Sequence, residues 1–446
     1  MSVKSFQKPW YLRIVLLIIL CMVVSSCTTP TQPVQQTKEL VVAPTEQKPV
    51  NLTITQWSSD PTQLALFNSM AQDYKKDHPN VSVTFQPITF ADYVSKLTVQ
   101  LAGSNPPDAG WIVDSTAPVF IAAGVMVDLR PTLEKYANYD LADFASGPMK
   151  LWEKGNAIYG VPFSTSPYLI YYNRDLFQKA GIDTPDKLLQ QGKWTWDALR
   201  AASKAIKAAT PSTVYGFESY GGGIYGARLW NTMGPLMKAF GGQAWNDAGT
   251  QCTINSPEAV AAFQFIHDMT FKDGSAVPPG EIVDFFSGNA GMILSQLSSS
   301  ANLKNATFKW DIAPLPSGPA GYKPVSGQAA FVVFNASKNV AVAADFIAFL
   351  TNKINVAKLA TYYPPARKSV MNMKEFLSSN PLISPESMKL AVANSIETGT
   401  VEVVHPEYLK IDIAAHGEID KIWKPGADIK AALDNTCKAI QPFMLK

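Results

Sequence analysis

Cysteine and histidine are scarce in this sequence of 446 residues, which contains four of each. No two cysteines form a C-x-x-C pair, and no two histidines form an H-E-x-x-H motif. Zinc sites are commonly built from ligands of these two types at such short spacings. We therefore expect no metal site, and nothing in the sequence indicates a bound cofactor.

Motifs for catalysis are missing as well. The chain has no G-x-S-x-G nucleophile elbow. Glycoside hydrolysis needs two carboxylates across a sugar, and Glu153, Glu218 and Glu281 are scattered without a pattern that would pair them. We expect a protein that is not an enzyme.

One glycine-rich stretch resembles a dinucleotide site. Residues 221–226 match G-x-G-x-x-G, and Asp247 follows at about the spacing of the acidic residue that binds the ribose. However, Ile224 and Tyr225 are bulky for a turn that holds a pyrophosphate. We interpret the stretch as a loop.

The first 50 residues have the pattern of an export signal and a tether. Three basic residues precede an apolar run at positions 14–24, which is shorter than the roughly 20 residues that span a bilayer. Val24-Ser25-Ser26-Cys27 then resembles the lipobox of bacterial lipoproteins. We expect residues 1–26 to be a signal peptide, Cys27 to carry a lipid anchor, and residues 27–50, rich in Thr, Gln and Pro, to be a disordered tether. The alternative is an ordinary signal peptide with a chance cysteine.

Charges of the two signs are nearly balanced. The 38 Lys and Arg against 36 Asp and Glu give a net charge of +2 at neutral pH. Loss of the three basic residues of the signal peptide would lower this charge by three, to −1. A protein that binds nucleic acid would show a basic excess. We expect no nucleic-acid partner.

Two cysteines remain in the body of the chain. Cys21 lies in the apolar run and would be lost with it, whereas Cys252 and Cys437 would be exported. Cysteine pairs in exported proteins tend to form disulfides because the compartment is oxidising. We expect a disulfide between Cys252 and Cys437.

Strands and helices alternate along the first part of the chain. Residues 52–57, 81–85 and 109–113 have the pattern of strands, and helical periodicity covers residues 61–77 and 90–102. Such alternation predicts parallel strands covered by helices. Further strands are expected at 168–172, 213–220 and 329–334, further helices at 197–208, 259–271 and 340–350, and a mainly helical C-terminal third.

Three stretches together resemble one protein family. Residues 77–112 contain His-Pro-Asn before one predicted strand and Pro-Asp before the next. Residues 158–162 read Ile-Tyr-Gly-Val-Pro, and Tyr-Tyr-Asn-Arg-Asp-Leu-Phe follows at 171–177. Residues 312–316 read Ile-Ala-Pro-Leu-Pro, and Pro-Ala-Arg-Lys-Ser-Val follows at 365–370. In this order, and over nearly the whole mature chain, they are similar to the family 1 extracellular solute-binding proteins of ABC importers, the sugar-binding group of maltose-binding-type proteins.

The resemblance implies an α/β fold of two lobes, each a mainly parallel sheet flanked by helices, with hinge crossings between them. Lobe one would hold residues 50–162 and 324–364, and lobe two residues 163–323 and 365–446. A small solute, in this group a sugar or oligosaccharide, would be captured between the lobes by a monomer and delivered to the permease subunits of an ABC importer. An exported glycoside hydrolase and a ligand-sensing receptor module are the alternatives.

Sugar hydroxyls bind planar or charged side chains, and the C–H face of a sugar packs on aromatic rings. We therefore expect ligand contacts where both types occur in loops at the ends of strands. The candidate ligand-binding residues are Trp57, Ser58, Asp60, Asp114, Thr165, Ser166, Tyr168, Tyr220, Tyr225, Trp230, Gln296, Gln328 and Arg367.

Several of these candidates have a structural alternative. Asp60 and Asp114 could cap helices, Arg367 could pair with a carboxylate, and the aromatic rings could pack in the core. Members of the resembling family often carry a ring after the strand that begins Gly-Met, where this chain offers Gln296 and Ser298 instead. That departure leaves the class of sugar open.

Overall fold

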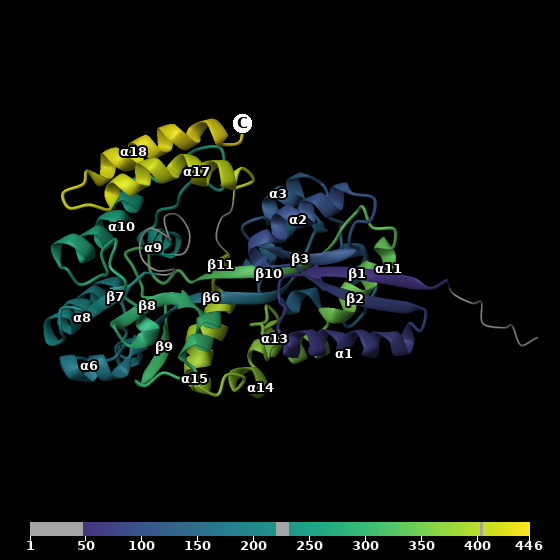
Figure 1. Ribbon diagram of the computed structural model, residues 1–446, viewed down its shortest axis with the longest axis horizontal. Helices are drawn as coiled ribbons and strands as arrows, with labels where there is room; N and C mark the ends of the chain where they lie inside the picture. Colours follow the sequence, from purple (N-terminus) through teal and green to yellow (C-terminus); the bar gives the residue numbers. More distant parts are fainter. Residues whose placement is uncertain (1–47, 220–231, 402–404) are drawn as a thin grey trace, which may run out of the picture. The chain divides into compact units, whose positions relative to one another are not determined.

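The computed structural model describes residues 48–219, 232–401 and 405–446, which form an α/β fold of two lobes (Figure 1). The strands are β1 (Val50–Gln56), β2 (Val81–Pro87), β3 (Ala109–Val113), β4 (Glu153–Lys154), β5 (Ala157–Ile158), β6 (Val161–Asn173), β7 (Tyr215–Glu218), β8 (Ala290–Gln296), β9 (Trp310–Pro314), β10 (Val325–Val333) and β11 (Thr400–Val401). Nine of these described strands form one sheet in the order β2-β1-β3-β10-β6-β8-β7, in which β11 pairs with β10 and β9 with β6.

The helices cover both lobes, and their bounds agree closely with the sequence predictions at residues 61–77, 90–102 and 340–350. The α-helices are α1 (Pro61–Asp77), α2 (Phe90–Ala102), α3 (Ala117–Ala122), α4 (Arg130–Leu133), α5 (Ser146–Lys150), α6 (Arg174–Ala180), α7 (Pro185–Gln190), α8 (Trp196–Ala209), α9 (Met233–Phe240), α10 (Pro257–His267), α11 (Val340–Leu350), α12 (Lys353–Leu359), α13 (Lys368–Met371), α14 (Lys374–Leu377), α15 (Pro385–Ser387), α16 (Asn394–Thr398), α17 (Tyr408–Ile419) and α18 (Ile429–Ile440). The helix expected at 259–271 ends as α-helix at His267 and continues as a π-helical turn.

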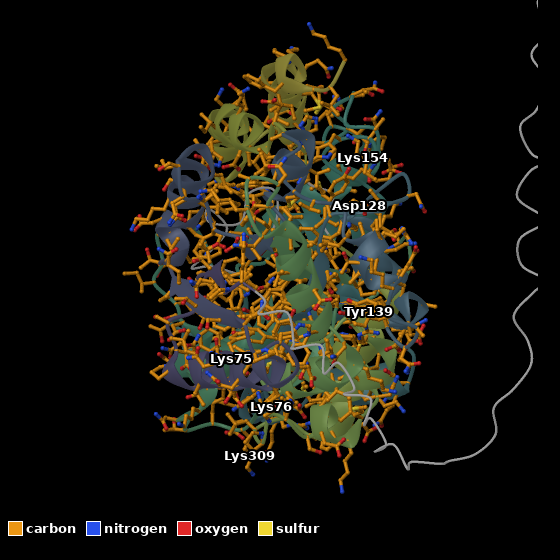
Figure 2. The ribbon with its side chains drawn as sticks, turned by 90° about the vertical axis from the view of Figure 1, so that its right-hand side faces the viewer. Lys75, Lys76, Asp128, Tyr139, Lys154 and Lys309 are labelled. Carbon is orange, nitrogen blue, oxygen red and sulfur yellow. A yellow bond between two sulfur atoms is a disulfide. The ribbon has the colours of Figure 1, made fainter. Side chains whose placement is uncertain are left out.

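Helix α1 illustrates how the local sequence sets an element. Asp60 accepts hydrogen bonds from the first backbone N–H groups, and Pro61 occupies the first helical position, where its missing N–H costs nothing. Phe67, Met70, Ala71 and Tyr74 form the buried face. Lys75 and Lys76 lie in the last turn, at the surface, where they complement the negative end of the helix dipole (Figure 2).

Strand direction follows from how the chain connects the strands. β1 is parallel to β2 and β3, because helices α1 and α2 carry the chain back between them, and β7 is likewise parallel to β8. In Figure 1, α2 and α3 lie on one face of β1–β3 and α1 on the other. β10 runs antiparallel to β3 and β6, and β6 runs antiparallel to β8 and β9.

Strand β6 connects the two parts of the sheet. Its residues 161–167 pair with β10, and its residues 168–173 pair with β8 and β9. One hydrophobic core is built mainly from residues 52–163 and 329–366, and a second mainly from residues 168–325 and 411–444. A third packs mainly residues 285–312 against 356–396. One sheet runs through both parts of the fold, so the strand pairing does not divide the chain into two lobes. The residue ranges given for lobe one and lobe two stay a prediction.

A disulfide joins Cys252 and Cys437, the pair expected from the sequence, with their Cα atoms 5.5 Å apart. It links the segment before α10 to α18, which are 185 residues apart in the chain. The C-terminal helix is thereby tied to the second core.

No single helix within the described residues is both long and apolar enough to cross a membrane. α11 and α12 reach the necessary length and composition only as a pair, and a bend of 68° separates them.

Candidate ligand-binding site

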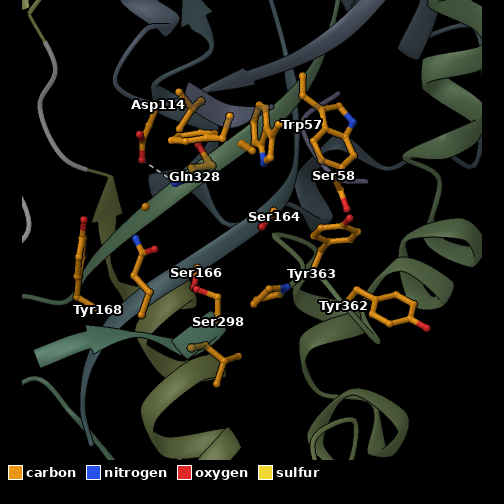
Figure 3. Close-up of a pocket in the computed structure, with 18 of the residues that line it drawn as sticks. Trp57, Ser58, Asp114, Ser164, Ser166, Tyr168, Ser298, Gln328, Tyr362 and Tyr363 are labelled. Carbon is orange, nitrogen blue, oxygen red and sulfur yellow. Dashed lines mark hydrogen bonds between the residues drawn. The ribbon is translucent and has the colours of Figure 1, made fainter. Parts of the chain in front are cut away.

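A cleft of about 1020 Å³ lies where the crossing strands β6 and β10 meet the ends of β1, β3 and β8. This volume is at the upper end of the range typical of small-molecule sites. Seven of the candidate residues line it, namely Trp57, Ser58, Asp114, Ser166, Tyr168, Gln296 and Gln328. Figure 3 shows Asp114 toward one end of the cleft and Tyr362 and Tyr363 toward the other, with Ser164 and Ser166 between them.

Three other candidates lie in the described residues but do not line the cleft: Asp60, Thr165 and Arg367. Tyr220, Tyr225 and Trp230 lie outside the described residues, as does the predicted lipidation site Cys27.

Asp60 has the structural role that was its alternative. Its side chain accepts hydrogen bonds from the backbone N–H groups of Thr62 and Gln63, each at 2.9 Å. Both bonds end on Oδ1, so this oxygen caps the N-terminus of α1, and the residue is exposed.

Thr165 faces away from the cleft because side chains alternate along a strand. Its neighbours Ser164 and Ser166 line the cleft, whereas Thr165 is fully buried on the other face of β6. There its Oγ1 accepts a hydrogen bond of 3.1 Å from Nε2 of Gln328. The alternation in Ser-Thr-Ser was a signal that could have separated Thr165 from its two neighbours.

Arg367 is fully buried and holds three chain segments together. Its guanidinium donates to the backbone carbonyls of Tyr139, Asp140 and Thr351 and pairs with the carboxylate of Asp143 at 3.3 Å. Arg367 does not line the cleft, and the carboxylate pair that was its alternative is present, while a ligand contact at Arg367 stays a prediction.

Gln328 of β10 forms hydrogen bonds to three other segments of the chain, at Asp114, Trp152 and Thr165. Its Oε1 accepts from Nε1 of Trp152 at 2.7 Å, and its Nε2 donates to Thr165. Its backbone N–H donates to Oδ2 of Asp114 at 2.6 Å. The side-chain carboxamide already has Trp152 and Thr165 as partners, so we do not expect it to contact a ligand. The backbone N–H of Gln328 instead helps to position the Asp114 carboxylate.

Asp114 follows β3 and presents its carboxylate to the cleft. Its two oxygens accept from the backbone N–H groups of Gln328 and Ser115, each at 2.6 Å. Burial raises the pKa of the Asp114 carboxyl to about 6, although both hydrogen bonds act in the opposite direction. The group is therefore mainly ionised at neutral pH, and a carboxylate with two oxygens can accept further hydrogen bonds.

Aromatic side chains form one wall of the cleft. The Trp57 ring meets those of Phe90, Tyr93 and Trp111 edge to face, with centroids 5.0–5.6 Å apart. Phe90 and Tyr362 are 62% and 39% exposed, so rings also line its rim. Such surfaces suit the apolar face of a sugar ring.

Several cleft residues were missed by the sequence prediction. Tyr363 lines the cleft, and both its hydroxyl and that of Ser58 donate to Oε1 of Gln63, which fixes the three side chains together. The run Tyr-Tyr-Pro-Pro directly before the predicted crossing at 365 was a usable signal for Tyr363. Trp111 lies inside a predicted strand, where no sequence signal distinguishes a cleft residue from a core residue.

Helix α17 contributes a second charged group. Asp412 and His416 are one turn apart, line the cleft, and form an ion pair at 3.0 Å when the imidazole is protonated. Tyr408 donates to the same carboxylate at 3.4 Å. No pattern placed this helix at the cleft, because its distance along the chain from β1 and β3 is large.

The charge of the cleft constrains its chemistry. Among the described lining residues there are two carboxylates, Asp114 and Asp412, one histidine, and no lysine or arginine. Within the same part of the chain, no group of three or more His, Cys, Asp or Glu side chains could hold a metal ion. The site can accept and donate hydrogen bonds and pack against rings, which suits a polyhydroxylated ligand.

Comparisons with known proteins show the family of this chain. Residues 58–357 match the family model of the bacterial extracellular solute-binding proteins. The sn-glycerol-3-phosphate-binding periplasmic protein of Brucella abortus is 24% identical over 407 residues, which cover 84% of this chain and 88% of that protein.

Solved structures share the fold. An ABC substrate-binding protein from Listeria monocytogenes in complex with cycloalternan matches with a TM-score of 0.74 and 24% identity, over 89% of this chain and 99% of that one. The cyclic α-maltosyl-1,6-maltose binding protein from Arthrobacter globiformis matches with a TM-score of 0.75 and 20% identity, over 88% and 98%. The fold is therefore the two-lobed one of periplasmic binding proteins, and by its sequence the chain belongs to the bacterial extracellular solute-binding protein family.

Proposed function

We propose that this protein is the extracytoplasmic binding component of an ABC importer that captures a sugar or oligosaccharide and delivers it to the permease. The observation that carries the proposal is the cleft at the crossing strands, which combines carboxylates, hydroxyls and amides with a wall of aromatic rings. The Listeria monocytogenes substrate-binding protein of the same fold was solved in complex with cycloalternan.

Binding would close the lobes without chemistry. Trp57 and Asp114, which line the cleft beside β1 and β3, would contact the ligand together with Gln296 of β8 and Asp412 of α17. A ligand that contacts both sides stabilises the closed form only by its preference for that form. To change the ratio of closed to open protein from 1:99 to 99:1, the ligand must bind the closed form more tightly by about 5.5 kcal/mol. A few hydrogen bonds to charged groups, at about 1.5–3 kcal/mol each, can supply this difference.

The carrier would act at the outer face of the membrane or cell envelope, held by lipid on Cys27 through the tether. The support is the Val-Ser-Ser-Cys sequence after a short apolar run. A tether of about two dozen residues lets the folded body reach a permease from a fixed anchor.

A thermal-shift panel tests the proposed function. Maltose, maltotetraose, cellobiose, lactose and sn-glycerol-3-phosphate are added to the purified mature protein. A true ligand at about 100 times its dissociation constant adds about 2.7 kcal/mol of stability. If no compound raises the unfolding temperature, the proposed ligand class is contradicted.

Small-angle scattering tests the mechanism. At saturation with the most stabilising compound, we expect a smaller radius of gyration than in the free protein, because the lobes approach each other. The compound should be recovered chemically unaltered. An unchanged radius, or a ligand that has been cleaved, contradicts closure without chemistry.

A further inference from the structure

Gly327 of β10 leaves a gap in the floor of the cleft that a polar side chain occupies. A Cβ atom added at this position would lie 2.3 Å from Nε2 of Gln296 and 3.5 Å from Oδ2 of Asp114. Real Cβ atoms do not approach other atoms as closely as the first distance, so the Gln296 amide can occupy this place only because residue 327 is glycine. Both polar atoms lie within 4 Å of the same point.

The surrounding residues come from four strands, two from the ends of strands and two from within strands. Gln296 is the last residue of β8, and Asp114 directly follows β3. Ser166 of β6 is the register partner of Gly327 in the antiparallel ladder. We call Asp114, Ser166, Gln296 and Gly327 together the hinge pocket, because they meet where the crossing strands join the two parts of the sheet.

One polar atom of the hinge pocket has no hydrogen-bond partner among the described residues. The hydroxyl of Ser166 is buried and makes no hydrogen bond to any described residue, although its residue lines the cleft. A buried hydroxyl without a partner costs free energy that a ligand group can recover.

The donors and acceptors of the hinge pocket suit two hydroxyl groups that are neighbours on a sugar ring. Asp114, when ionised, only accepts, so it binds an O–H donor. The Gln296 amide and the Ser166 hydroxyl both donate and accept, so they bind the oxygen of one hydroxyl and the proton of the next. A phosphate would bring its negative charge beside Asp114, and no lysine or arginine among the described lining residues would offset the repulsion.

We propose that the hinge pocket binds two neighbouring hydroxyl groups of an uncharged carbohydrate and that Gly327 determines this specificity by leaving room for the Gln296 amide. The inference rests on the proposed function and narrows its ligand to uncharged sugars. It also distinguishes this chain from its relative named for sn-glycerol-3-phosphate.

Titration calorimetry on four forms of the mature protein tests this inference. The probes are maltose, maltotetraose, cellobiose and lactose as uncharged sugars and sn-glycerol-3-phosphate as the anion. The variants are Gly327→Ala, which fills the gap, and Gln296→Ala, which removes the amide without adding atoms. Gly417→Ala is the matched control, because a Cβ there meets nothing within 4 Å.

We expect at least one of the four sugars, and not sn-glycerol-3-phosphate, to bind the wild type. Gly327→Ala and Gln296→Ala should each weaken that sugar by about tenfold or more, the loss expected for two hydrogen bonds, whereas Gly417→Ala should stay within about twofold. If Gly327→Ala does not fold, Gln296→Ala carries the test alone.

Three results would overturn the inference. Binding of sn-glycerol-3-phosphate without any of the sugars would refute the uncharged class and leave the carrier function standing. Folded Gly327→Ala and Gln296→Ala proteins that bind a sugar as the wild type does would refute the role of the hinge pocket alone. Failure of all five probes to bind would contradict the proposed ligand class, and the inference would be lost with it.

Discussion

At Asp114, one carboxylate both holds the returning strand β10 and faces the cleft. Two backbone N–H groups orient it, and burial raises its pKa to about 6. A ligand hydroxyl that donates to this group favours its ionised form. Protonation and ligand binding therefore compete at this residue.

We predict that sugar affinity falls as the pH drops below about 6, by up to tenfold per pH unit, because binding must then release a proton. The folded-state pKa lies above the value of 3.8 for the free side chain, so this group by itself makes the protein more stable, not less, as the pH falls toward 4. Loss of affinity therefore cannot be attributed to unfolding caused by Asp114. Calorimetry with the best-binding sugar between pH 5 and 8 measures the effect.

Asp114→Asn is the control for this pH dependence. The variant should bind more weakly, by about tenfold or more, and should lose the dependence near pH 6. A pH dependence of affinity that persists in Asp114→Asn would contradict the role of the Asp114 carboxyl in it.

Arg367 is expected to matter for stability and not for affinity. Arg367→Met would remove three hydrogen bonds to backbone carbonyls and leave the carboxylate of Asp143 without its charged partner. Breaking such a buried pair costs about 3–5 kcal/mol of unfolding free energy.

Urea unfolding measures this cost, with Lys353→Met, at an exposed position, as a control expected within about 0.5 kcal/mol of the wild type. Sugar affinity of the folded Arg367→Met protein should match the wild type. Normal stability combined with weakened affinity would restore Arg367 as a ligand contact.

The disulfide ties helix α18 to the second core. It thereby supports the wall of the cleft that α17 forms, because α17 packs against α18. α17 packs along α18 and carries Asp412 and His416. Loosening α18 is thus expected to reach the cleft through α17.

We predict that the double variant Cys252→Ser, Cys437→Ser loses about 2–5 kcal/mol of stability, because the unfolded chain gains freedom when a long loop is opened. Urea unfolding with and without reductant measures the loss. The reduced wild type should behave as the double variant does. Coincident curves for the oxidised and reduced wild type would show that the cross-link has no effect on stability.

Attachment of the whole molecule to the cell is predicted to depend on Cys27. We predict that Cys27→Ser moves the protein from the membrane fraction to the soluble fraction, because the lipid chains that the cysteine would carry provide about 0.8 kcal/mol per buried CH₂ group. Fractionation with detection by antibody measures the distribution. Cys21→Ser, inside the apolar run, is the matched control and should remain with the membrane. A Cys27→Ser protein that resists a high-salt wash and stays in the membrane fraction would contradict lipid anchoring.

Secondary structure that depends on neighbouring residues could be predicted from the sequence. Strand β3 and helices α1, α2 and α11 lie where periodicity, caps and prolines predicted them, since these signals act between residues close in the chain. Trp57 and Asp114 were found because they follow strands whose ends meet at one edge of a sheet. The secondary-structure elements depend on residues a few positions apart, and the positions of Trp57 and Asp114 follow from the order of the strands.

Contacts at the cleft between residues far apart in the chain could be seen only in the three-dimensional structure. Asp412 and His416 reach the cleft because α17 packs on the second core, and the Gln296 amide lies over Gly327 because two strand ends coincide. Thr165 and Arg367 do not line the cleft for the same reason: Thr165 lies on the other face of β6, and packing buries Arg367. Thr165 and Gln328 are 163 residues apart, and Arg367 and Asp140 are 227 apart. No local pattern encodes the depth at which contacts between such distant segments place a side chain.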